Sequence, residues 1–190
     1  MVSLSKGQKV NLSKEAPNLK QALIGLGWSV NAFDGDDYDL DASVFLTDAN
    51  GKCPSENDFI FYSNLQHPSG SVIHTGDNRT GEGEGDDEQI KIYLDRVPSN
   101  IQKISFVVTI YEADKRNQNF GDVSDAYIVL RNMENNQEIL RYDLSEDYST
   151  ETALIVAELY RSGNEWKFSA VGKGWQGGLA AVCRHFGINA

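Results

Sequence analysis

The fold is indicated most clearly by the run Phe33-Asp-Gly-Asp-Asp-Tyr-Asp-Leu-Asp-Ala-Ser-Val-Phe-Leu46. Successive side chains of an extended chain alternate between two faces. The apolar face would carry Tyr38, Leu40, Ala42, Val44 and Leu46, and the opposite face would carry Asp37, Asp39, Asp41 and Ser43. The run therefore predicts a strand with one face in the core, whose other face begins as a column of carboxylates.

A second acidic stretch, Gly76–Glu88, contains six carboxylates, one asparagine and four glycines within thirteen residues. Burial of so many carboxylates would cost them their hydration. The glycines allow the backbone to turn and to present several carbonyl oxygens in one place. The stretch is therefore either a solvated acidic loop or one wall of a site for a hard cation.

The net charge of −11 is concentrated in these two stretches. They hold eleven of the 28 acidic residues and one of the 17 basic residues, which leaves 17 acidic against 16 basic residues elsewhere. The excess negative charge is thus more consistent with a local function of these two stretches than with general solubilisation of the protein. Nucleic-acid binding is disfavoured, because phosphates require a basic face.

Most of the chain reads as short strands, which predicts one all-β domain over residues 1–190, a β-sandwich of two mainly antiparallel sheets. Helical spacing is limited to the polar segment Glu112–Gln118 and the C-terminal segment Gly178–Gly187. Gly163-Asn164 between two alternating runs indicates a hairpin. The remaining strand candidates are Leu23–Trp28, Asp58–Tyr62, Ser71–His74, Glu88–Leu94, Lys103–Tyr111, Ala126–Asn132, Glu138–Leu144, Thr152–Arg161 and Glu165–Val171.

A cytoplasmic location is expected, because the start of the chain lacks an apolar signal region and two cysteines are too few for a secreted disulfide framework. The apolar runs are too short for a membrane span, so the chain is not expected to be a membrane protein. We expect Cys53 to be a solvent-exposed thiol and Cys183 to be a small core residue on the last helix.

Clustered carboxylates, an asparagine and backbone carbonyls form the oxygen ligand set that Ca²⁺ prefers. An EF-hand is excluded, because Asp77–Glu88 has Glu82 where that loop requires glycine and Asp37–Asp41 is followed by Ala42. A site shared between the two acidic stretches explains the composition better. Mg²⁺ is less suited, since it retains its waters, and functionless solvated loops remain the alternative.

Other chemistries have weaker support. The acidic residues within Gly81-Glu-Gly-Glu-Gly85 would repel a phosphate. Paired carboxylates could serve acid–base catalysis, but no sequence feature marks one of them as desolvated. The three histidines, His67, His74 and His185, lack metal-site spacing and are expected to be surface or packing residues.

Several motifs together resemble the tellurite-resistance TerD family over essentially the whole chain. They are Gly25-Leu-Gly-Trp28, Asp37-Tyr-Asp-Leu-Asp-Ala-Ser43, Phe61-Tyr-Ser-Asn64, His74–Glu88, Glu158-Leu-Tyr-Arg161 and Glu165-Trp-Lys-Phe168. The resemblance implies a calcium-binding β-sandwich in a bacterial cytoplasm, with a stress-response role that covers tellurite and, in some operons, phage and colicin. No enzymatic activity is implied.

The resemblance implies metal ligands in both acidic stretches: Asp37, Asp39, Asp41, Asp77, Asn78, Glu82, Asp86, Asp87 and Glu88. Two calcium ions are expected, because eleven carboxylates exceed the needs of one. Expected partners are other tellurium-resistance proteins and a membrane-associated complex. The alternatives are a metal-dependent hydrolase acting on a phosphoester, a tellurite reductase that uses Cys53, and a small-ligand binder such as one for cyclic nucleotides.

Overall fold

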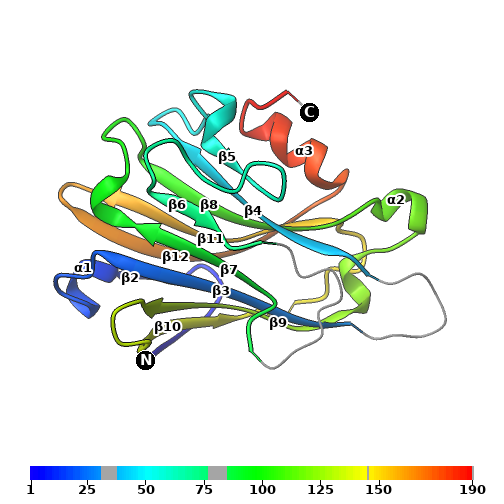
Figure 1. The fold of residues 1–190 in the computed structure, drawn as a ribbon. Coiled ribbons are helices and arrows are strands. Elements are labelled where there is room, and N and C mark those ends of the chain that lie inside the picture. The colour runs from blue at the N-terminus through cyan, green and yellow to red at the C-terminus, as the bar shows by residue number, and fades with distance from the viewer. Residues whose placement is uncertain (31–37, 77–84, 145, 190) are drawn as a thin grey trace.

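Two β-sheets pack face to face in this protein (Figure 1). The computed structural model describes residues 1–30, 38–76, 85–144 and 146–189. Over these residues the first sheet has six strands, in the spatial order β1 (Val2–Leu4), β10 (Glu138–Asp143), β9 (Val123–Asn132), β3 (Gln21–Val30), β7 (Glu88–Tyr93) and β6 (Val72–His74). Neighbouring strands are antiparallel except for β1 and β10, which are parallel.

The second sheet also has six strands in the described residues, and all of its pairs are antiparallel. Its spatial order is β2 (Lys9–Asn11), β12 (Glu165–Trp175), β11 (Ala153–Ser162), β8 (Lys103–Ile110), β4 (Leu40–Thr47) and β5 (Phe59–Ile60). The β11–β12 hairpin closes at the pair Ser162 and Glu165, with Gly163 at a φ of 63°. That positive φ suits glycine, as the turn sequence predicts.

The main core fills the space between the sheets. The alternation predicted for β4 is confirmed in its described part, because Leu40, Ala42, Val44 and Leu46 belong to this core. Phe45, one residue out of phase, belongs instead to a second apolar cluster on the outer face of the second sheet. Every residue of β4 is buried, since both faces of the strand are covered.

The second cluster is covered by α3 (Gly178–His185) and by the chain around Cys53. Val182, Cys183 and Phe186 face the sheet, as their helical spacing predicts, and Gly187 follows the helix at a φ of 81°. In Figure 1, α3 lies on the side of β4 and β8 away from the first sheet. The short helix therefore adds a third layer over one half of the second sheet.

The other helices are single turns, α1 (Leu12–Glu15) and α2 (Ala113–Arg116), with 3₁₀ turns η1 (Glu56–Asp58), η2 (Leu94–Arg96) and η3 (Phe120–Asp122). The chain between β5 and β6 crosses from one sheet to the other. The backbone N–H of His74 donates to Leu65 O (2.7 Å), and that of His67 donates to Val72 O (3.0 Å). These bonds join the edge strand β6 to the segment that leads from β5 of the second sheet. They thereby close one side of the sandwich.

The predicted β-sandwich with a C-terminal helix is confirmed, and each predicted strand overlaps an observed one. β1, β2 and α1 were not predicted, because segments of three or four residues are too short to show a period. β12 extends to Trp175, beyond the predicted end at Val171, across an irregularity in its pairing with β11 between Ile155 and Ala157. The predicted exposure of Cys53 is wrong, since the residue is buried in the second apolar cluster together with residues of α3.

Removal of the Phe186 ring tests the third layer. Phe186 is 4% exposed and its ring centroid lies 4.5 Å from that of Phe45. Phe186→Ala should lower the free energy of unfolding by about 3 kcal/mol in urea titrations, because buried aromatic truncation leaves a cavity. Tyr62→Ala is the control, because Tyr62 is 44% exposed and its loss should change stability by about 0.5 kcal/mol. Equal effects of the two variants would contradict the packing described for α3.

Candidate functional site

The two acidic stretches meet the sandwich at one end, formed by the end of β3 and the starts of β4 and β7; we call it the loop end. The Asp87 N–H donates to Leu26 O (2.8 Å), and the Trp28 N–H donates to Asp87 Oδ2 (2.7 Å). The Ala42 N–H donates to Glu88 Oε2 (2.8 Å). These three bonds connect β3, β4 and β7, so the described borders of both acidic stretches lie close together.

Four of the nine predicted ligands, Asp37, Asp77, Asn78 and Glu82, lie outside the described residues. The other five are described, and the fold directs them to different surroundings. Within the described part of the chain, no three histidine, cysteine or acidic side chains converge as a metal site would require. The ligand set therefore stays a prediction, and each described member is considered in turn.

Asp39 immediately precedes β4 and Asp41 is its second residue, and both lie on its outward-facing side. The Tyr111 N–H donates to Asp39 O (2.7 Å), which continues the β4–β8 pairing, and Asp41 pairs with Thr109. Because Leu40 between them enters the core, both carboxylates face the outer side of the second sheet. Asp41 is only 8% exposed. These two carboxylates share one face, as the alternation predicts.

Asp86 lies on the outer face of the first sheet. Its carboxylate forms a two-pronged ion pair with Arg131, accepts from the Tyr127 hydroxyl (3.0 Å) and accepts from Gln89 Nε2 (3.2 Å). The side chain is 2% exposed and rests over Gly25, where a Cβ would lie 2.2 Å from Asp86 Oδ2. Burial and the Asp86 charge raise the pKa of Tyr127 to about 12, so Tyr127 remains a donor. Asp86 therefore already has a structural role.

Asp87 combines a structural contact, the hydrogen bond from the Trp28 N–H, with a carboxylate that a cation could still bind. Burial raises its pKa, the hydrogen bond from the Trp28 N–H opposes this, and the charge of Asp86 raises it further. The sequence did not mark any carboxylate as desolvated, and the structure identifies this one. A cation placed beside Asp87 would favour its ionised form.

Glu88 lies between the sheets and is 2% exposed. Besides the bond from Ala42, its Oε2 lies 3.1 Å from His74 Nε2, which is also 3.2 Å from Ala42 O. The Gly76 N–H donates to His74 Nδ1 (3.0 Å), so the ring proton resides on Nε2 and the imidazole acts as a donor towards Glu88. Sequence reasoning missed this bridge. The alternation Glu88, Ile90, Ile92 would have placed Glu88 on the core side.

A second histidine–carboxylate pair lies on the same closed side of the sandwich. His67 Nε2 is 2.8 Å from Asp58 Oδ1, and His67 Nδ1 accepts from the Ser69 N–H (3.1 Å). Asp58 Oδ2 accepts from the backbone and hydroxyl of Ser55. His67 and His74 are thus buried packing residues. Packing was one of the two roles that the sequence predicted for the histidines, and surface exposure was the other.

Neither cysteine is prepared for nucleophilic chemistry. Burial, and then the charge of Asp58, raise the pKa of the Cys53 thiol to about 12. Burial also raises the pKa of Cys183 to about 11. Since the thiolate is the reactive form, both side chains are unreactive at neutral pH in the folded protein.

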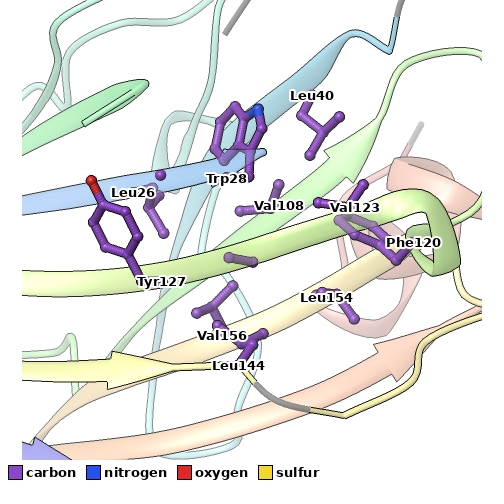
Figure 2. Close-up of a pocket in the computed structure, with 12 residues that line it drawn as sticks. Leu26, Trp28, Leu40, Val108, Phe120, Val123, Tyr127, Leu144, Leu154 and Val156 are labelled. Atoms are coloured by element: carbon purple, nitrogen blue, oxygen red, sulfur yellow. The ribbon is translucent and has the colours of Figure 1, made fainter. Parts of the chain in front are cut away.

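An apolar cavity between the sheets lies beneath the loop end, as Figure 2 shows. Its walls include Leu26, Trp28, Leu40 and Phe120, but its volume is about 10 Å³. That space is close to the minimum for one water molecule and provides no polar partner for one. The cavity is a packing gap and does not form a ligand site. In addition, the described helices include none that is long and apolar enough to cross a membrane.

Comparisons with known proteins agree with this architecture. The family model of the TerD domain matches residues 1–186. The chain is 61% identical to tellurium resistance protein TerD of Serratia marcescens, covering 100% of this chain and 98% of that protein. It is 58% identical to general stress protein 16U of Bacillus subtilis (strain 168), covering 98% of this chain and 97% of that protein.

The fold also matches a crystal structure of a homologue of telluride resistance protein (TerD) from Streptomyces coelicolor A3(2). The TM-score is 0.70 at 22% identity, covering 91% of this chain and 100% of the other. At that identity the match concerns the fold, whereas the family model and the two close relatives concern the family. The chain belongs to the TerD family.

Proposed function

We propose that this protein is a calcium-binding module of a tellurite and general stress response and acts by binding rather than by catalysis. The observation that carries the proposal is the bond from Ala42 N–H to Glu88 Oε2, because it holds the borders of the two acidic stretches at one end of the sandwich. Carboxylates at this density repel one another unless a cation offsets their charge.

We assign the metal to Asp39 and Asp41, which share one face, and to Asp87, together with Asp37, Asp77, Asn78 and Glu82. Oxygen ligands of this kind suit Ca²⁺, which accepts six to eight of them in flexible geometry. Asp86 and Glu88 contribute to the scaffold instead, because Arg131 and Tyr127 hold the first and Ala42 and His74 hold the second. Two ions remain our expectation, given the number of carboxylates.

Calcium would offset the charge at the loop end and join its two acidic stretches into one ordered surface. That surface would then be recognised by other tellurium-resistance proteins in the cytoplasm, including a membrane-associated complex. The names of the relatives from Serratia marcescens and Bacillus subtilis support the stress-response part of this proposal.

A thiol-dependent reduction of tellurite has less support. It would require a thiolate at Cys53, and the buried position of that side chain raises its pKa to about 12. A metal-dependent hydrolase would require a placed base next to an open coordination position. Among the described carboxyls, Asp86 and Glu88 are already engaged, so no observation favours this activity over binding.

Calcium should stabilise the fold. A ligand that binds only the folded state at a hundredfold excess over its Kd adds about 2.7 kcal/mol. The melting temperature in calcium should therefore exceed that in EGTA by several degrees in differential scanning calorimetry, and Mg²⁺ at the same concentration should do less. An identical midpoint in calcium and in EGTA would refute the proposed ion.

Substitutions of Asp39 and Asp86 should separate the metal site from the scaffold. Asp39→Asn should leave stability in EGTA nearly unchanged and remove the calcium-induced shift. Asp86→Asn should destabilise the protein by about 3 kcal/mol with or without calcium, because it breaks the buried pair with Arg131.

Asp143→Asn is the matched control for Asp86, since Asp143 is 63% exposed and its pair with Arg141 lies at the surface. Its expected cost is below about 1 kcal/mol. If Asp86→Asn retained full stability and lost only calcium binding, the division of roles described above would be wrong.

The thiols of Cys53 and Cys183 should not react in the native protein. At pH 8, well below the raised pKa of both cysteines, Ellman's reagent should label no thiol in the folded protein and two after denaturation. Tellurite added to the folded protein should likewise leave both thiols countable after unfolding. Rapid labelling of Cys53 in the native state would restore the reductase alternative.

A further inference from the structure

A serine, a histidine and an aspartate form a hydrogen-bonded chain in the segment that runs from η1 to β6. Ser69 Oγ lies 2.7 Å from His67 Nδ1, and His67 Nε2 lies 2.8 Å from Asp58 Oδ1. Asp58 is 7% exposed and His67 is 5% exposed, whereas Ser69 lies at the surface. A buried imidazole and carboxylate therefore support an exposed hydroxyl. This order of groups is that of a nucleophilic serine with its general base.

The protonation state of His67 is set by its two neighbours. The Ser69 N–H donates to His67 Nδ1 (3.1 Å), so the ring proton resides on Nε2 and faces Asp58. Asp58 is held by a capping box at η1, in which its Oδ2 accepts from the Ser55 N–H (2.8 Å) and hydroxyl (3.1 Å). The imidazole is thus oriented with its unprotonated nitrogen towards Ser69, as a general base requires.

The Ser69 hydroxyl has two acceptors within reach, His67 Nδ1 and Ser71 Oγ, the second at 2.7 Å. Ser71 is 0% exposed, and Ser69 Oγ is the only hydrogen-bond partner of its hydroxyl within the described residues. If Ser69 donated to Ser71, the buried Ser71 hydrogen would lack an acceptor, which is costly. The favoured arrangement therefore has Ser71 donating to Ser69, and Ser69 donating to His67.

The turn that carries Ser69 also brings two exposed donors next to it. The Gly70 N–H donates to His67 O (2.8 Å), and Gly70 has a φ of 70°. A Cβ at Gly70 would lie 3.7 Å from Arg96 Nη1 and 3.9 Å from Gln66 Nε2. Arg96 thereby brings positive charge to the turn. Donors of this kind stabilise the negative charge that develops on a carbonyl oxygen under attack.

We propose that Ser69 is a nucleophile that accepts an acyl group from activated esters. His67 Nδ1 takes the proton of the Ser69 hydroxyl as Oγ forms a bond to the ester carbonyl carbon. The bond from that carbon to the leaving oxygen then breaks, and His67 returns the proton to the leaving oxygen, which departs as an alcohol. Asp58 stabilises the imidazolium in between. The products are an O-acyl serine and the alcohol, and no further reactant is required.

This serine site is separate from the proposed calcium site. The Tyr93 N–H donates to Ser71 O (2.7 Å), and Tyr93 lies at the end of β7 opposite to Glu88. None of the nine predicted metal ligands belongs to the chain of Asp58, His67 and Ser69. Acylation of Ser69 is a single covalent modification and requires no turnover. It is therefore compatible with a protein that acts by binding.

The test is the reaction of the full chain with p-nitrophenyl acetate at neutral pH. We expect a burst of one p-nitrophenolate per chain and an acetyl group on Ser69 in the peptide map. Ser69→Ala should remove the burst, because a positioned general base contributes about a hundredfold or more to such a rate. Ser63→Ala is the matched control, because Ser63 is exposed in the same connection and bonds to no histidine among the described residues. It should retain the full burst.

Two cysteine variants separate activation by His67 from exposure alone. A histidine neighbour lowers the pKa of a thiol. Ser69→Cys should therefore react with Ellman's reagent about tenfold faster than Ser63→Cys at about pH 6. Cys53 and Cys183 are buried and should not contribute to either rate. Melting curves of the serine variants should match that of the unchanged protein, since both serines are exposed.

Acetylation confined to lysines, or an equal burst in Ser69→Ala and Ser63→Ala, would overturn the proposal. Equal thiol rates in the two cysteine variants would overturn it too, because the pair of His67 and Asp58 would then only hold the turn. The burst should be the same in calcium and in EGTA, and all these variants should bind calcium as the unchanged protein does. The serine and calcium proposals can therefore fail separately.

Discussion

The buried bridge among Glu88, His74 and the backbone of Ala42 is the constraint on which the loop end depends. β5 pairs with β4 only at Val44 and Phe45, so the earlier part of β4 needs other partners on that side. Glu88 accepts from the Ala42 N–H, and His74 Nε2 faces the Ala42 carbonyl. A buried backbone group without a partner would cost as much as a lost hydrogen bond. Side chains from the first sheet thus replace a neighbouring strand of the second.

This bridge also explains why the two acidic stretches lie together. The last acidic residue of the first stretch, Asp41, immediately precedes Ala42, and the second stretch ends at Glu88, so the bridge fixes the positions of both. It is also a buried polar network, which is stabilising only when every member is satisfied. The tautomer of His74, set by the Gly76 N–H, supplies the donor that the Glu88 carboxylate requires. The geometry of the loop end therefore depends on His74, a residue that the spacing of histidines in the sequence did not mark as functional.

Neighbouring carboxylates of similar sequence context have different physical roles. Asp86, Asp87 and Glu88 are consecutive, yet the first pairs with Arg131 on an outer face, the second caps the Trp28 amide, and the third is buried between the sheets. The close approach of Asp86 to the sheet depends on Gly25, because any side chain there would occupy the position of the carboxylate. An acidic cluster in a sequence is thus not by itself a ligand set.

The sequence by itself determined the sandwich, the alternation along β4, the β11–β12 hairpin and the apolar face of α3, because each rests on a local period or turn. It also determined where the excess negative charge lies. Only the tertiary structure decided which carboxylates are engaged with Arg131 or His74, and that Cys53 is buried in one cluster with a helix more than a hundred residues away in the chain. Burial and ion pairing depend on residues brought together by folding, which no local pattern encodes.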